Sequence, residues 1–188
     1  PNADSKDLDY ICEQLINIIA KLPTIVAYNY NVLKFRKGGD LMLLMPHPEK
    51  NTAENFLYML NGREPDSYDA KIFDIMMVLH AEHGGGNNST FSVRTVSSSG
   101  ANTYMSISAG LASLSGYLHG GANEMVMRMM RELKKNINDW CNENEIREYL
   151  TDILDGRRGD GSGKIYGLGH AVYTMTDPRA EILRGYAR

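Results

Sequence analysis

Three histidines of this chain lie beside glycines in short segments of small and polar residues. The segments read His80-Ala-Glu-His83-Gly-Gly-Gly-Asn-Asn-Ser, Leu118-His119-Gly-Gly-Ala-Asn-Glu and Gly167-Leu-Gly-His170-Ala-Val-Tyr. Imidazole offers a donor and an acceptor near neutral pH, and glycine lets the backbone approach a ligand closely. A single pair of this kind is more often structural than functional, but three such segments in one chain predict one shared pocket.

His80 and His83 fall at the end of a predicted helix. They follow Met76 and Leu79 by four residues each, so both continue the apolar stripe of that helix to its stop at Gly84. They are therefore expected to face inward, either as core histidines or as part of the pocket. Two histidines at this spacing could also bind a metal, but no third ligand stands at a recognisable spacing, and no metal site is predicted.

His119 lies between two predicted helices, the second of which begins between residues 121 and 123. The positive end of a helix disfavours a charged imidazole. A neutral imidazole can donate a hydrogen bond to a carbonyl that becomes an enolate, as the electrophilic histidine of triosephosphate isomerase does. The position of His119 therefore favours a catalytic role.

Arg179 is two residues into a helix that begins at Asp177-Pro178. A guanidinium beside the free amides of a helix N-terminus suits a carboxylate or a phosphate. The alternative is an ordinary surface arginine. Its short distance in sequence from His170 favours the anion site.

Helical periodicity dominates the rest of the sequence and predicts an almost wholly α-helical chain. Leu8 opens an apolar stripe that is expected to stop at Pro23. A helix over residues 52–60 is expected to start at Asn51 or Thr52 and to stop at Asn61-Gly62. Only residues 41–45 could form a short strand. Further stripes predict three core-facing helices: Ile72, Ile75, Met76 and Leu79; Val126, Met129, Met130 and Leu133; Ile146, Tyr149, Leu150 and Ile153.

Two segments have unusual composition. Residues 97–116 are crowded with Ser, Gly and Ala, which fits either one tightly packed internal helix or, in addition, a subunit interface at a twofold axis. Residues 155–164 are rich in glycine and charge and predict a loop, either a solvated surface loop or a mobile segment that covers a substrate beside His170.

Composition excludes several classes of protein. The chain has 188 residues, 20 Lys and Arg against 23 Asp and Glu, and a pI near 6.0, so nothing favours nucleic acid or an anionic membrane. Cys12 and Cys141 match no metal or redox spacing and predict buried or incidental thiols in a reducing compartment. No unbroken apolar run has the length of a membrane helix, and no signal-peptide pattern opens the chain, so a cytoplasmic protein is expected.

The three histidine segments, with Leu114-Ser-Gly-Tyr before the second and Asp177-Pro-Arg179 after the third, resemble the citrate synthase family in order and spacing. The resemblance is clearest from about residue 72 to residue 179. It implies a mostly α-helical homodimer of the Si type, with residues 1–118 in the large domain and residues 119–188 at the start of the small domain. It also gives weight to the subunit interface in residues 97–116.

The resemblance implies condensation of acetyl-CoA with oxaloacetate and water to citrate and CoA, with no further cofactor. By that similarity His119 and His170 are catalytic: His119 stabilises the enol of acetyl-CoA and His170 polarises the ketone of oxaloacetate. Three residues are expected to bind oxaloacetate: His83, Asn87 and Arg179. Six are expected to form the CoA-binding loop: Lys164, Ile165, Tyr166, Gly167, Leu168 and Gly169.

The family's catalytic aspartate follows the third motif and has no counterpart in residues 1–188. Both ends look cut from a longer chain, so the 188-residue piece alone is expected to be inactive. A 2-methylcitrate synthase acting on propionyl-CoA shares every motif quoted above. A non-catalytic helical dimerisation module and a metal-dependent hydrolase built on His80 and His83 are the alternatives from other classes.

Overall fold

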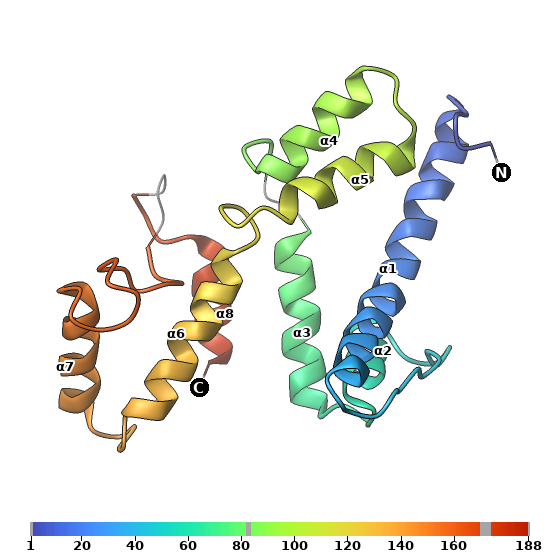
Figure 1. Cartoon of the computed structure of the whole chain (residues 1–188). Coiled ribbons are helices and arrows are strands. Elements are labelled where there is room, and N and C mark those ends of the chain that lie inside the picture. Colours follow the sequence, from blue (N-terminus) through green and yellow to red (C-terminus); the bar gives the residue numbers. More distant parts are fainter. Residues whose placement is uncertain (1, 82–83, 170–173, 188) are drawn as a thin grey trace.

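The computed structural model describes residues 2–81, 84–169 and 174–187, so His83 and His170 lie outside the described residues. Within those ranges the chain forms helices joined by turns and loops, with no strand, and the expected all-α class is confirmed (Figure 1). The helices are α1 (Leu8–Arg36), α2 (Thr52–Asn61), α3 (Ser67–His80), α4 (Asn88–Ser98), α5 (Thr103–Leu114), α6 (Ala122–Asn136), α7 (Glu143–Leu154) and α8 (Pro178–Tyr186).

Local capping chemistry sets the bounds of α2 and α8, as the sequence predicted. Asn51 caps α2 in a capping box, in which its side chain accepts from the amide of Glu54 and the Glu54 carboxylate accepts from the amide of Asn51. Gly62 ends the same helix with a φ of 73°. Asp177 caps α8, and Pro178 takes its first position.

Helix α1 does not stop at Pro23, and that prediction is wrong. Proline removes one backbone hydrogen bond, which disfavours a helix interior by about 3 kcal/mol, but the second half of α1 is packed on α2. Ala27 is fully buried there, and Asn31 is 1% exposed and donates from Nδ2 to the carbonyl of Met59 at 2.8 Å. These tertiary contacts outweigh the proline.

Residues 41–45 form no strand, so the prediction of a short strand there is wrong. A strand needs a neighbouring strand to pair with, and this segment is held by side-chain contacts instead. The Tyr28 hydroxyl donates to the carbonyl of Leu44 at 2.9 Å, and the Met42 side chain lies so close to Gly62 that a Cβ there would overlap its sulfur. The segment is a loop that packs over α1 and the end of α2.

Helix α1 is the one helix in the described ranges whose length and composition would suit a membrane span. Buried Gln14 and Asn31 lie on this helix, and Asn31 bonds to α2. Only 11% of the most apolar window of this helix is buried.

Residues 97–116 hold one complete helix, α5, which follows the end of α4 at Ser98 and a short loop and is capped by Asn102. Small residues let the two helices approach closely. A Cβ added to Gly110 would lie 2.6 Å from a methyl group of Val93, and Ser106 is 4% exposed. These residues therefore pack closely within the chain, as one interpretation of their composition predicted. The subunit interface stays a prediction.

Buried apolar side chains form two separate groups. Ala27, Ala53, Met59 and Ala70 pack among α1, α2 and α3, while Leu133, Ile137, Tyr149 and Ile153 form a cluster between α6 and α7. Helix α8 contacts α3, and the Tyr68 hydroxyl donates to the carbonyl of Tyr186 at 2.7 Å. The predicted domain division at residues 118 and 119 falls in the turn between α5 and α6 and stays a prediction.

Candidate active site

His119 lies in the tight turn that joins α5 to α6. Its amide and that of Gly120 both donate to the carbonyl of Gly116, at 3.0 and 2.9 Å. A Cβ on Gly120 would overlap the carbonyl of Leu114, and one on Gly121 would overlap that of Tyr117. The glycines beside His119 are therefore required by the close approach of backbone to backbone, which fixes the half-buried histidine at the start of α6.

The imidazole of His119 has a hydrogen-bond partner on α4. Its Nε2 lies 2.8 Å from Oγ of Ser89, in the first turn of α4. A neutral imidazole carries one donor and one acceptor nitrogen. If Ser89 donates to Nε2, the proton stays on Nδ1, and Nδ1–H can then donate to a carbonyl oxygen. This geometry suits the stabilisation of an enolate.

Asn87, predicted to bind substrate, is the N-cap of α4. Its side-chain oxygen accepts from the amide of Thr90 at 3.1 Å, and the residue is half-buried. The cap uses Oδ1 and leaves the amide nitrogen of the side chain as a donor for a ligand. Substrate binding by Asn87 stays a prediction.

His80 does not face inward, and that prediction is wrong. Its side chain is exposed and its Nδ1 donates to the carbonyl of Met76, one turn earlier in α3, at 2.6 Å. Met76 is itself exposed. The apolar stripe therefore does not carry His80 into the core. Within residues 2–81, 84–169 and 174–187, no three His, Cys, Asp or Glu side chains gather as metal ligands.

Arg179 lies in the first turn of α8 beside Asp177. Its Nε is 3.0 and 3.1 Å from the two carboxylate oxygens of Asp177, and one terminal nitrogen is 2.5 Å from Oδ2. Asp177 also accepts from the amide of Arg179 as the helix cap. Asp177 therefore orients the guanidinium that was predicted to bind a carboxylate.

The predicted CoA-binding loop packs on α6 and α7. Ile165 contacts the apolar cluster between these helices, and Tyr166 is half-buried. Gly167 has a φ of 89°, and a Cβ there would lie 3.3 Å from a methyl group of Val126 on α6. Because α6 begins directly after the His119 turn, one helix supports both the second and the third glycine-rich segments. Lys164, Leu168 and Gly169 are exposed.

Comparison with known proteins decides the family. The family model for the citrate synthase C-terminal domain matches residues 2–188. The chain belongs to the citrate synthase family. It is 41% identical over 180 residues to a citrate synthase of Haloferax volcanii and 38% identical over 181 residues to one of Synechocystis, each match covering 96% of this chain and 43% or 41% of the relative. The chain thus spans about two fifths of the length of these relatives.

Solved structures agree with the sequence relatives. Citrate synthase from Pyrobaculum aerophilum superposes with a TM-score of 0.70 at 36% identity, over 90% of this chain and 38% of the other. The enzyme from Thermotoga maritima gives 0.68 at 31% identity, over 97% and 45%. The citrate synthase fold expected from the three motifs is therefore confirmed.

Ser89 was not predicted from the sequence as part of the candidate active site. Ser89 stands in the first quoted segment, but nothing in the sequence says that it meets His119, because the meeting depends on how α4 and α5 fold back on each other. The hydrogen bond joins the first and second histidine segments, as the shared-pocket hypothesis requires. The roles of the predicted site residues stay predictions.

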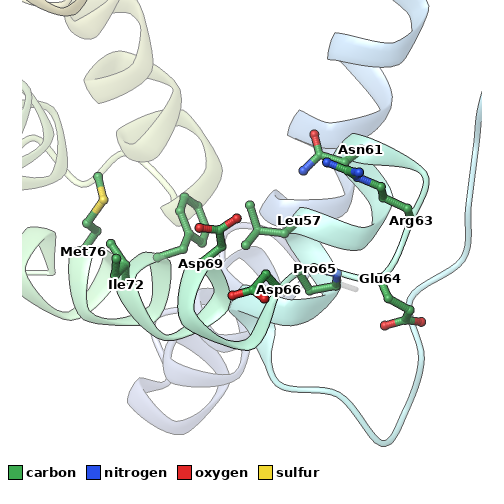
Figure 2. A pocket seen from close by; sticks show the side chains of 10 residues that line it. Leu57, Asn61, Arg63, Glu64, Pro65, Asp66, Asp69, Ile72 and Met76 are labelled. Carbon is green, nitrogen blue, oxygen red and sulfur yellow. The ribbon is translucent and has the colours of Figure 1, made fainter. Parts of the chain in front are cut away.

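Cys12 and Cys141 are both exposed free thiols, so the buried alternative is wrong for each. A cavity of about 500 Å³ opens elsewhere, between α2 and α3 (Figure 2). Leu57 and Ile72 contribute apolar walls, while Asp66 and Asp69 supply carboxylates. None of the residues that line it belongs to the three histidine segments, so this cavity is separate from the candidate active site.

Proposed function

We propose that the complete protein containing this chain is a Si-type citrate synthase. It condenses acetyl-CoA with oxaloacetate and water to give citrate and CoA. Membership of the family supports the reaction class, and the Ser89–His119 hydrogen bond is the observation that carries the assignment. Acetyl-CoA enters as a substrate, and the reaction needs no metal or further cofactor.

The proposed chemistry begins at the methyl group of acetyl-CoA. A carboxylate base from outside residues 1–188 takes a methyl proton, and the electron pair moves onto the thioester oxygen. Nδ1–H of His119 donates to that oxygen, while Ser89 holds Nε2. A positioned donor at a developing oxyanion lowers the barrier because its charge is already oriented. The enol carbon then attacks the ketone of oxaloacetate, which His170 polarises.

Oxaloacetate is a dianion, and its binding is proposed for Arg179, His83 and Asn87. Asp177 orients the Arg179 guanidinium through Nε and one terminal nitrogen. Water then hydrolyses the citryl thioester and releases CoA. The homodimer and a cytoplasmic location remain part of this proposal.

The test uses the complete protein with acetyl-CoA and oxaloacetate and measures CoA release as free thiol. His119→Ala and His170→Ala are expected to lower kcat by about 100-fold or more, since each removes a donor at a developing or polarised oxygen. His80→Ala is the matched control, because His80 is exposed and bonds only to Met76. Near wild-type turnover by either active-site variant would disprove the role given to that histidine.

Two alternatives are outcomes of the same assay. A higher kcat/KM for propionyl-CoA than for acetyl-CoA would make the protein a 2-methylcitrate synthase. Binding and dimerisation without turnover would make it a non-catalytic module.

A further inference from the structure

The glycine-rich segment after α7 is fixed at its beginning. Arg157 and Arg158 both donate from Nε to the carboxylate of Asp152, at 2.9 and 3.0 Å, and Arg157 also pairs with Asp155 at 2.8 Å. The guanidinium of Arg158 lies over the Tyr149 ring at 4.7 Å. Hydrogen bonds from Arg157 and then Arg158 lower the pKa of Asp152 below its ordinary value. The segment therefore leaves α7 in a defined direction.

A second set of hydrogen bonds closes the segment further along. The Tyr166 hydroxyl donates to Oδ2 of Asp160 at 2.5 Å, and the amide of Ser162 donates to Oδ1 of the same carboxylate at 3.0 Å. Oγ of Ser162 lies 3.3 Å from the Tyr166 hydroxyl. Asp160, Ser162 and Tyr166 thus contact one another in a closed ring. Asp160 accepts hydrogen bonds from both of the other residues.

The backbone of the segment accommodates this ring through glycine. Gly161 and Gly163 have φ values of 74° and 68°, which other residues adopt only with strain. A Cβ on Gly163 would lie 2.9 Å from the carbonyl oxygen of Leu154 at the end of α7. The chain therefore turns tightly between Asp160 and Tyr166, so that the two side chains meet.

This ring lies beside the predicted CoA-binding residues and includes one of them, Tyr166. Tyr166 directly precedes Gly167, which packs on Val126 of α6. Asp160, Lys164 and Tyr166 line one small pocket against α6. We propose that Asp160 is a positioning residue, which holds Tyr166 and so keeps residues 164–169 in the conformation that receives an acyl-CoA. This inference rests on the proposed function, and Asp160 itself does not touch the substrate.

The test compares Asp160→Ala, Tyr166→Phe and the double variant in the complete protein. Each single variant removes the same hydrogen bond, so each is expected to raise the KM for acetyl-CoA by about 3- to 10-fold. The double variant is expected to be no worse than the more affected single variant, because the two residues act as one unit. The values of kcat and of the KM for oxaloacetate are expected to stay within about 2-fold.

Asp155→Ala is the matched control. Asp155 is a carboxylate of the same segment and pairs with Arg157, but it does not contact Tyr166. Its loss is expected to leave the KM for acetyl-CoA unchanged. Additive effects of the two single variants, an unchanged KM in both, or an equal loss for both substrates would each overturn the positioning role.

Binding of coenzyme A itself, measured by calorimetry, separates this inference from the proposed function. If the wild-type protein lacks turnover yet binds CoA more tightly than Tyr166→Phe does, the proposed function fails and the positioning role stands. Amide hydrogen exchange in residues 161–169 gives a second readout that needs no activity. Faster exchange in Asp160→Ala than in Asp155→Ala supports the inference, and equal exchange overturns it.

Discussion

Oγ of Ser89, in the first turn of α4, lies 2.8 Å from Nε2 of His119, thirty residues later in the chain. If the serine hydroxyl donates in this contact, the imidazole carries its proton on Nδ1. In that tautomer, the Nδ1 edge of His119 is the donor available to a substrate carbonyl.

Ser89→Ala is expected to lower kcat for condensation by about 5- to 30-fold, because Nε2 loses its partner and the tautomer is no longer fixed. Ser92→Ala is the control, since Ser92 is on the same helix and bonds only to the carbonyl of Asn88. Steady-state kinetics give the rate, and nitrogen NMR of labelled histidine gives the tautomer. An unchanged rate with an altered tautomer would show that this hydrogen bond does not matter for catalysis.

Asn87 has a visible structural role and a predicted binding role, and two variants separate them. Asn87→Ala removes the cap of α4 and is expected to lower the free energy of unfolding by about 1 kcal/mol. Asn87→Ser keeps a capping oxygen and is expected to restore that stability. If the amide also binds oxaloacetate, the KM for oxaloacetate stays raised in Asn87→Ser. Restoration of both quantities would leave Asn87 as a helix cap alone.

Arg179→Lys tests the proposed anion site on α8. Lysine keeps the charge but cannot present the planar pair of donors that a carboxylate accepts. The KM for oxaloacetate is expected to rise by about 10-fold or more, with a smaller change in the KM for acetyl-CoA. Arg184→Lys, in the last turn of the same helix, is the control. Equal effects of the two substitutions would contradict a specific role for Arg179.

The sequence predicted those parts of the fold that depend on neighbours in the chain. The capping box at Asn51 and the start of α8 at Asp177-Pro178 are local signals, and both lie where they were expected. Pro23 was misjudged because Ala27 and Asn31 pack on another helix, which local propensity does not include. Tertiary packing routinely outweighs such propensities.

The same distinction applies to the candidate site. Glycine beside histidine pointed to His119, yet the structure shows that these glycines are needed first for the close turn before α6. Ser89 could not be found from spacing, because only the α4–α5 hairpin brings it to the imidazole. The contacts of Asp160 could not be predicted for a different reason. A glycine-rich, charged segment predicts a solvated loop whether or not its side chains form hydrogen bonds with one another.

The ring around Asp160 predicts a pH dependence. Hydrogen bonds from Ser162 and Tyr166 lower the pKa of Asp160 to about 2. A carboxyl whose pKa is lowered by folding stabilises the folded loop above its ordinary pKa and loses that contribution only as the pH falls towards 2. The ratio of acetyl-CoA KM values between Asp160→Ala and wild type is therefore expected to be constant from about pH 6 to 9. A ratio that changes within this range would mean that another titrating group controls the loop.

The α4–α5 hairpin gives a stability prediction that links packing to the site. Gly110→Ala would bring its Cβ within 2.6 Å of a Val93 methyl group, next to the backbone of Ser89. Overpacking of this kind lowers the free energy of unfolding by about 1 to 3 kcal/mol. Gly185→Ala, in α8, is the control because no atom lies within 4 Å of its Cβ, and it is expected to be neutral or slightly stabilising.

Denaturant unfolding of the two glycine variants measures both effects. Because a Cβ on Gly110 would lie 3.5 Å from the carbonyl oxygen of Ser89, Gly110→Ala is also expected to lengthen the Ser89–His119 hydrogen bond and to lower kcat in the same direction as Ser89→Ala. If Gly110→Ala does not lower the free energy of unfolding, α4 and α5 can move apart at this point without loss of stability. Loss of stability with an unchanged kcat would mean that the hairpin absorbs the added methyl group away from Ser89.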